Sequence, residues 1–224
     1  MLRELRETCA LLKGSGSRRL IYDHVTHNTS YIIRGADAAV FTFYALPFTY
    51  PMPHLNVEIK ARCADQQAIR DILRAQGADF RGTDYQTDTY FNVGYGRLKL
   101  REGNIENALV YYEREDKAGP KQAHVTLYPT TPDSGLKEIL TKALSTLVVV
   151  EKQREIYFIE NIKFHLDTVA RLGTFVEIEA IDTDGTVGQE QLLAQCRAFL
   201  ELLQISSNDL IAVSYSDLLL AERV

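Results

Sequence analysis

Charged side chains recur at every second position in several short segments of this sequence. In an extended chain this spacing places them on one face, because successive side chains of a strand point to opposite sides. The segments contain Asn56, Glu58, Lys60 and Arg62; Arg97, Lys99 and Arg101; Lys152 and Arg154; His165 and Asp167; and Glu177 and Glu179. Lysine and arginine bind phosphate oxygens, whereas carboxylates are the ligands that Mg²⁺ or Mn²⁺ prefers. The residue types favour a site for a polyanion and a divalent metal.

A polar strand face has a simpler explanation, since an antiparallel sheet can leave one face to water. The faces in this sequence, however, carry paired cations or paired carboxylates and not the mixture of Thr, Ser and Gln of an ordinary solvated face. If the sheet closes into a barrel, the charged faces converge inside and the apolar faces turn outward. Such an interior is reasonable only when its charges pair or a polyanion and its metal fill it.

The elements that must position these residues are short strands between amphipathic helices. Strands are predicted over 55–62, 85–92, 96–102, 108–115, 123–128, 147–158, 163–168 and 174–181. Helices are predicted over 65–77, 134–147 and 189–204, and a last one begins at Ser214, where Ser214 and Asp217 have the spacing of a capping box. This order predicts an α+β fold: a closed antiparallel eight-stranded β-barrel with a charged interior, covered outside by the helices.

The composition limits the classes of function. The chain has 224 residues and a formal net charge of −5, which argues against general nucleic-acid binding. It has no apolar run near the ~20 residues that a membrane span needs, so no membrane partner is expected. Cys9, Cys63 and Cys196 have no metal-binding spacing and suit a reducing compartment. A cytoplasmic protein is expected.

A domain boundary is predicted near Met52. Residues 1–52 contain a Gly-Ser break at 14–17 and an aromatic, proline-rich stretch at 41–53, whereas regular alternation begins at Leu55. We therefore expect an N-terminal extension over 1–52 and one domain over 53–224. Two alternatives stay open: the extension belongs to the native protein, or Met52 is its first residue.

The ordered set of charged segments resembles the CYTH superfamily over about residues 54–220. This superfamily of triphosphate tunnel metalloenzymes includes class IV adenylate cyclases and thiamine triphosphatases. The segments that carry the resemblance are Asn56-Val57-Glu58-Ile59-Lys60, Asp88-Thr89-Tyr90-Phe91, Gly96 to Glu102, Glu151-Lys152-Gln153-Arg154, Asp167, and Leu172 to Glu179. The tail Ser214-Tyr215-Ser216-Asp217-Leu218-Leu219 is similar to the cyclase branch.

The resemblance implies roles for individual residues. Phosphate binding and catalysis would fall to Glu58, Lys60, Lys99, Arg101, Lys152, Arg154 and Asp167. Further contacts to the substrate would come from Arg62, Asp88, Tyr90 and Arg114. The ligands of Mg²⁺ or Mn²⁺ would be Glu58, Asp167, Glu177 and Glu179. One departure matters: Asn56 stands where the family has its first glutamate, which predicts weaker metal binding or one tightly held ion instead of two.

Three functions are consistent with these features. The resemblance favours an adenylate cyclase that converts ATP to cyclic AMP and pyrophosphate. The shared motifs specify the phosphates and not the attached group, so a triphosphatase acting on inorganic tripolyphosphate, thiamine triphosphate or another organic triphosphate is the main alternative. A non-catalytic module that binds polyphosphate or a nucleotide is the third, with Asn56 marking lost catalysis. Exposed Tyr and Leu on the last helix suggest a homodimer contact.

Overall fold

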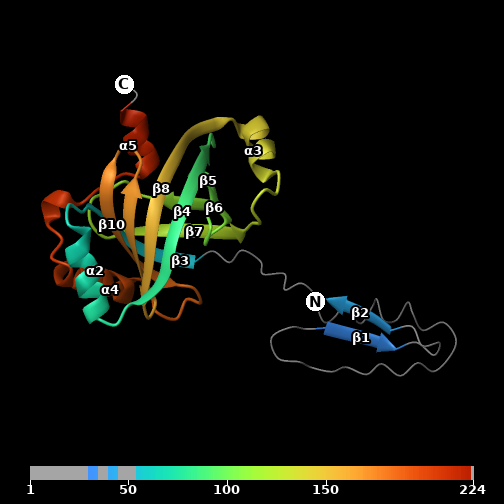
Figure 1. Cartoon of the computed structure of the whole chain (residues 1–224), viewed down its shortest axis with the longest axis horizontal. Coiled ribbons are helices and arrows are strands. Elements are labelled where there is room, and N and C mark those ends of the chain that lie inside the picture. The colour runs from blue at the N-terminus through green and yellow to red at the C-terminus, as the bar shows by residue number, and fades with distance from the viewer. Residues whose placement is uncertain (1–29, 35–39, 45–53, 223–224) are drawn as a thin grey trace. The chain divides into compact units, whose positions relative to one another are not determined.

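A computed structural model of the protein describes residues 30–34, 40–44 and 54–222 (Figure 1). The chain divides into two units, residues 1–50 and 51–224, which are described separately. In the first unit, β1 (Ser30–Arg34) and β2 (Val40–Tyr44) form a two-stranded antiparallel sheet. The predicted boundary at residue 52 lies outside the described residues.

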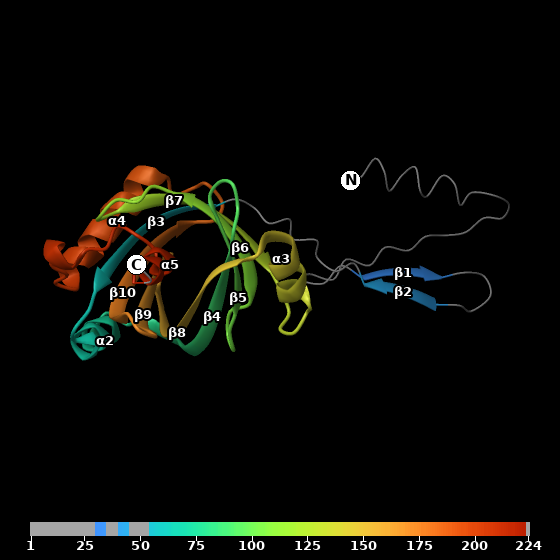
Figure 2. The ribbon, with the colours of Figure 1, turned by 90° about the horizontal axis from the view of Figure 1, so that it is seen from above.

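The second unit is a closed barrel of eight strands, each antiparallel to its neighbours (Figure 2). Around the barrel the order is β10-β3-β7-β6-β5-β4-β8-β9. The strands are β3 (His54–Arg62), β4 (Asp79–Phe91), β5 (Arg97–Glu102), β6 (Ala108–Arg114), β7 (Lys121–Pro129), β8 (Thr146–Ile159), β9 (Ile162–Val169) and β10 (Gly173–Asp182). The predicted α+β fold with a closed eight-stranded antiparallel barrel is confirmed.

The strand register brings the charged faces together inside the barrel. Lys60 pairs with Glu177 across β3 and β10, and Asp88 pairs with Arg101 across β4 and β5. Directly opposed residues of antiparallel strands point to the same side of the sheet. Because the alternation within each strand continues around the barrel, the charged faces of neighbouring strands meet in one interior.

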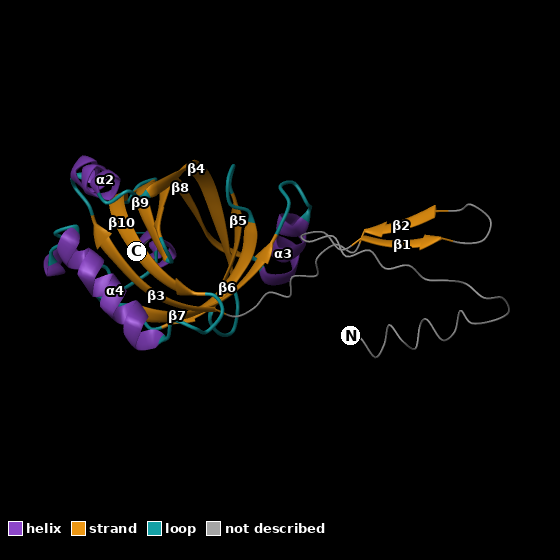
Figure 3. Ribbon diagram, turned by 90° about the horizontal axis from the view of Figure 1, so that it is seen from below, coloured by secondary structure: helices purple, strands orange, loops and turns teal. Residues whose placement is uncertain are grey.

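Helices α2 (Gln66–Ala75) and α4 (Gln189–Leu202) cover the outer face of β3, β9 and β10 (Figure 3). The alternate residues of these strands form a dry core with the two helices, which includes Ile59, Phe164 and Leu192. On another side, α3 (Leu136–Leu144) lies against β4 but has no fully buried residue. The apolar faces of the strands therefore turn outward, as the alternation predicted.

The C-terminal segment closes one end of the barrel. After the short helix η1 (Ser207–Asp209), the backbone N–H of Ile211 donates to the Lys60 carbonyl at 2.8 Å. Helix α5 (Tyr215–Ala221) then inserts Tyr215 and Leu219 among interior apolar residues such as Phe175. Both views of the barrel place α5 at this end (Figures 1 and 2). Tyr215, the tyrosine of α5, and Leu219 are buried, whereas Leu218 and Leu220 are half-buried. The expected exposure of the tyrosine is therefore wrong, and the homodimer stays a prediction.

Most predicted element bounds agree with the structure to within two residues, and two differ by more. The helix predicted over 134–147 ends at Leu144, because Ser145 has φ 58° and Thr146 already begins β8. Strand β4 begins at Asp79, six residues before the predicted start, because it pairs along the whole length of β8. In the described residues, no helix is long and apolar enough to cross a membrane.

Candidate functional site

The barrel encloses a cavity of about 430 Å³. In the described part of the chain, seven cationic side chains line it: Lys60, Lys99, Arg101, Arg114, Lys152, Arg154 and Lys163. Four carboxylates line it as well: Glu58, Glu106, Glu177 and Glu179. The wall therefore carries more positive than negative charge, although the protein as a whole is acidic.

Asp88 holds three of these cations from behind the cavity wall. Its carboxylate is 1% exposed and lies 2.6 Å from Lys152 Nζ, 2.9 Å from Lys99 Nζ and 2.9 Å from Arg101 Nε. Burial alone would raise the pKa of Asp88, but the positive charges of Arg101, Lys152 and Lys99 outweigh it and hold the pKa well below its ordinary value. Asp88 thus orients the cations and does not itself line the cavity.

Lys152 is the cation of this group whose pKa is lowered. Burial lowers its pKa to about 7, because the attraction of Asp88 does not offset desolvation and the repulsion of Arg154 and Arg101. The ammonium is therefore held near its titration point in the free protein. An anion in the cavity would favour the charged form.

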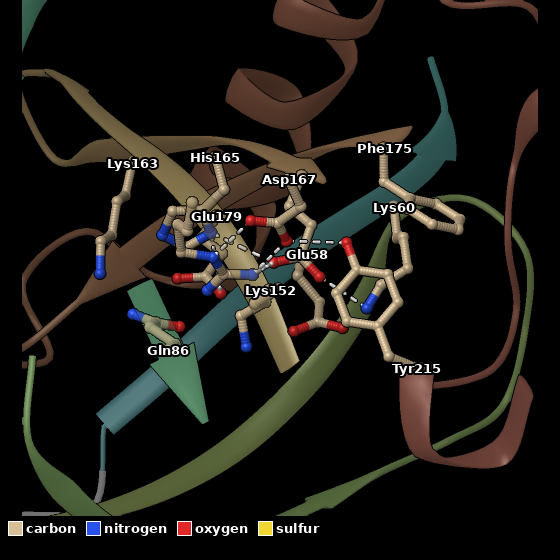
Figure 4. Close-up of polar contacts among 12 residues, drawn as sticks. Glu58, Lys60, Gln86, Lys152, Lys163, His165, Asp167, Phe175, Glu179 and Tyr215 are labelled. Carbon is tan, nitrogen blue, oxygen red and sulfur yellow. Dashed lines mark hydrogen bonds and ion pairs between the residues drawn. The ribbon is translucent and has the colours of Figure 1, made fainter. Parts of the chain in front are cut away.

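A second network crosses β3, β8, β9 and β10 (Figure 4). Arg154 binds both oxygens of Asp167, with Nε–Oδ1 at 2.7 Å and Nη2–Oδ2 at 2.5 Å, and it also donates to Glu177 at 2.6 Å. Lys60 Nζ lies 2.5 Å from Glu177 and 3.9 Å from the centre of the Tyr215 ring. The Tyr215 hydroxyl donates to Asp167 at 2.8 Å. Helix α5 is thereby tied to the same network.

Arg114 has donors to spare. Its Nη1 pairs with Glu58, while Nε and Nη2 are buried and find no hydrogen-bond acceptor within the described residues. Lys121 lies behind Glu58 at 4.0 Å and donates to the carbonyls of Ile211 and Ala212. Buried donors without acceptors are costly, so the free donors of Arg114 indicate a place for an anionic ligand.

A metal could be held on the wall formed by β9 and β10. His165, Glu177 and Glu179 offer ligand atoms that lie within 4.8 Å of one another. His165 Nδ1 is 3.1 Å from Glu177, while its Nε2 is buried without a partner in the part of the chain that the structure describes. Burial and the charge of Arg154 lower the pKa of His165, which favours the neutral imidazole. Asn56 Oδ1 is likewise buried without a donor.

The predicted metal ligands are not equally free. Glu58 and Glu179 line the cavity, and among the described residues the one group in ion-pair range of the Glu179 carboxylate is His165, at 4.0 Å. Asp167 has both oxygens occupied by Arg154 and Tyr215. Glu177 is engaged in the same way, with Oε1 2.5 Å from Lys60 and Oε2 2.6 Å from Arg154, and Glu58 pairs with Arg114. Asp167 and Glu177 could therefore join a metal only after their cationic partners release them.

Two residues at the open end of the cavity were not predicted. Glu106 follows β5 in the loop 103–107, and its carboxylate pairs with Arg101 at 2.9 Å and with Lys163 of β9. A loop residue shows no alternation, so the sequence pattern could not reveal Glu106. Lys163 has the same parity as His165 and Asp167, and this spacing could have identified it.

The structure brings most of the predicted residues to the cavity but leaves two predicted cations outside. Arg62 is exposed at the end of β3, where it lies over the Phe175 ring and reaches the Leu172 carbonyl at 3.4 Å. Arg97 pairs with Asp116 and Asp217 and does not line the cavity. Tyr90, in contrast, lines the cavity and is 5% exposed.

Comparison with known proteins agrees with this geometry. The family model described as "CYTH domain" matches residues 54–215, which is more than half of the chain. The protein therefore belongs to the CYTH family. The predicted family resemblance is confirmed.

Individual relatives match about three quarters of the chain. A Methanocaldococcus jannaschii protein named "Putative adenylate cyclase MJ0240" is 27% identical over 175 residues, which cover 73% of this chain and 98% of that protein. The PH1012 protein from Pyrococcus horikoshii OT3 is 24% identical with a TM-score of 0.64, covering 73% of this chain and 98% of its own. HpAC1 from Hippeastrum is described as a putative adenylyl cyclase with a dominant triphosphatase activity. It is 14% identical with a TM-score of 0.52, and the match covers 76% of this chain and 95% of HpAC1. The two structures show likeness of fold.

Proposed function

We propose that this protein is a metal-dependent enzyme that acts on a triphosphate, most readily by cyclising ATP to cyclic AMP and pyrophosphate. The observation that carries the proposal is the closed barrel with seven cations around one 430 Å³ cavity. Among the described residues the cavity wall has seven cations and four carboxylates, an excess of three positive charges, which is opposite in sign to the charge of a triphosphate, about −4. The name of the archaeal relative supports the cyclase as the leading reaction.

The cations are held in place before any substrate binds. Asp88 fixes Lys99, Arg101 and Lys152, and Asp167 fixes Arg154 in a two-point contact. Preorganised donors stabilise developing charge without reorganisation at the moment of reaction. These side chains would grip the phosphate oxygens and offset the negative charge that grows on the leaving group.

A divalent ion fits the same cavity. Glu58, Glu177 and Glu179 would hold Mg²⁺ or Mn²⁺, and the unpaired Asn56 oxygen faces the same space as a neutral oxygen donor. The ion would supply Lewis-acid stabilisation of charge on the phosphates. Asn56 keeps an oxygen but removes one negative charge, which is consistent with one tightly held ion.

The two candidate reactions differ in the nucleophile. In the cyclase, the ribose 3′-oxygen bonds to the α-phosphorus and the bond to pyrophosphate breaks. In a triphosphatase, water bonds to a terminal phosphorus and orthophosphate leaves. The second reaction is favoured by one feature: the charged residues of the cavity suit phosphates and no side chain among them is specific for adenine. The description of HpAC1 also supports it.

Product analysis distinguishes the candidates. The full-length protein is incubated with Mg²⁺ or Mn²⁺ and, separately, ATP, thiamine triphosphate or inorganic tripolyphosphate, and the quenched products are separated by ion-exchange chromatography. Reactions with excess chelator provide the matched control. We expect cyclic AMP and pyrophosphate in equal amounts from ATP.

Orthophosphate without cyclic AMP would establish a triphosphatase instead, and the best substrate would define its class. No metal-dependent product from any substrate would refute an enzymatic role. Tight binding without turnover would then support the third function, a module that binds polyphosphate or nucleotide. We further expect the enzyme to act in the cytoplasm.

A further inference from the structure

Glu106 is a carboxylate fixed at the mouth of a cavity that otherwise attracts anions. Its side chain accepts from Arg101 Nη1 at 2.9 Å, from Lys163 and from Gln86 Nε2 at 3.2 Å. Arg101 and Lys163 both line the cavity, so Glu106 occupies two of the cations that would otherwise face phosphate. Its negative charge therefore stands at the end of the cationic wall.

The loop that carries Glu106 is held rigidly. The buried carboxylate of Asp84 accepts from the backbone N–H of Ile105 at 2.8 Å and of Glu106 at 2.9 Å. A Cβ on Gly103 would come within 2.6 Å of the same carboxylate, so only glycine allows this close approach. The position of the Glu106 backbone is thus fixed by β4, and the side chain cannot withdraw with its loop.

A long ligand has to pass Glu106. The opposite end of the cavity is closed by Tyr215 and Leu219 of α5. The open end is lined by the exposed residues Ile105, Leu127 and Pro129, beside Glu106. Figure 4 shows Lys163, the partner of Glu106, and Tyr215 on opposite sides of the charged cluster. A ligand longer than the cationic part of the cavity would therefore extend toward the mouth.

We infer that Glu106 is a specificity residue that limits the phosphate chain to three units. This inference rests on the proposed triphosphate site. A fourth phosphate would lie beside a fixed like charge, whereas a neutral hydroxyl-bearing group in the same place could donate to the carboxylate. Selection against a longer anion by a repulsive charge would explain why a carboxylate is built into the end of an anion-binding wall.

The test compares the binding of inorganic tripolyphosphate and tetrapolyphosphate by titration calorimetry in EDTA, so that no metal-dependent turnover occurs. We expect wild-type protein to bind tripolyphosphate about tenfold or more tightly than tetrapolyphosphate. Glu106→Gln should reduce this ratio to about threefold or less. Glu106→Asp keeps the charge and should retain most of the discrimination.

Glu102→Gln is the matched control, because Glu102 lies at the end of β5 and pairs with Lys137 outside the cavity. This variant should have the wild-type ratio. An unchanged ratio in Glu106→Gln, or no preference in the wild type, would overturn the inference while leaving the proposed function intact. Failure of wild-type protein to bind either anion would overturn both.

Discussion

Replacing the buried Asp88 by asparagine should lower the free energy of unfolding more than the same replacement at an exposed aspartate. Asp88→Asn would leave Lys99, Arg101 and Lys152 without the carboxylate that lies 2.6 to 2.9 Å from each of them. Breaking a buried ion pair by removing one partner costs about 3–5 kcal/mol. For a chain of this size the loss corresponds to a decrease in Tm of about 6–20 °C.

The assay is thermal unfolding at pH 7 followed by far-ultraviolet circular dichroism. Asp79→Asn is the control on the same strand, because Asp79 is 59% exposed and its one ion pair within the described residues is with Arg81. That variant should change stability by no more than about 0.5 kcal/mol. Tripolyphosphate should restore part of the stability lost in Asp88→Asn, since phosphate oxygens would pair with the same cations. Equal Tm values for the two variants would refute the assignment of Asp88 as their anchor.

Three further predictions follow from single groups. The pKa of Lys152 is about 7 in the folded protein, below its unfolded value, so the contribution of this group to the free energy of unfolding should rise with pH above 7. Bound tripolyphosphate should raise the pKa of Lys152, so the protein should take up protons when the ligand binds. The affinity for tripolyphosphate should therefore fall as pH increases from 7 to about 9. Calorimetry in buffers of different ionisation enthalpy measures the uptake, and no proton exchange would contradict it. Tyr215→Phe removes the 2.8 Å hydrogen bond to Asp167 and should lower the free energy of unfolding in urea by about 1–2 kcal/mol, whereas an unchanged midpoint would count against that bond. Leu219→Ala should cost about 2–4 kcal/mol in the same assay because Leu219 is 3% exposed inside the barrel end, and Leu202→Ala, at a 37% exposed position, should cost much less.

Alternation within strands predicted most of the interior. Lys99 and Arg101 lie two residues apart on β5, and period two alone places both on the face that proved to be inside. The prediction of a closed barrel required a further argument: charged strand faces are stable inside a barrel only when they converge and their charges pair or bind a ligand. The register confirms this argument in pairs such as Lys60 with Glu177.

Long-range contacts set the features that the sequence did not reveal. Glu106 reaches the cavity because Asp84, 22 residues earlier, fixes its loop. Period two also placed Arg62 and Arg97 on interior faces, but both lie near strand ends, where the barrel no longer encloses them. Local pattern defines the face of a residue, whereas its depth along the barrel depends on pairing between distant strands.

The last helix illustrates the same limit. The capping box of Ser214 and Asp217 is a local signal, and the structure contains both of its hydrogen bonds. The Tyr and Leu residues of the last helix suggested an exposed face that suits a homodimer contact. In the structure, Tyr215 and Leu219 of this helix fill the barrel end. An apolar helix face requires a partner, and the sequence alone does not say which surface supplies it.

The most direct test of the central claim is the rate of metal-dependent triphosphate turnover in Lys99→Met and Lys142→Met. Lys99 lines the cavity, whereas Lys142 is 76% exposed on α3 and pairs with Glu138. We predict that Lys99→Met loses about 10- to 100-fold in kcat/KM, as expected for one charged contact to the phosphates, and that Lys142→Met keeps the wild-type rate. Equal rates in both variants would contradict a triphosphate site inside the barrel.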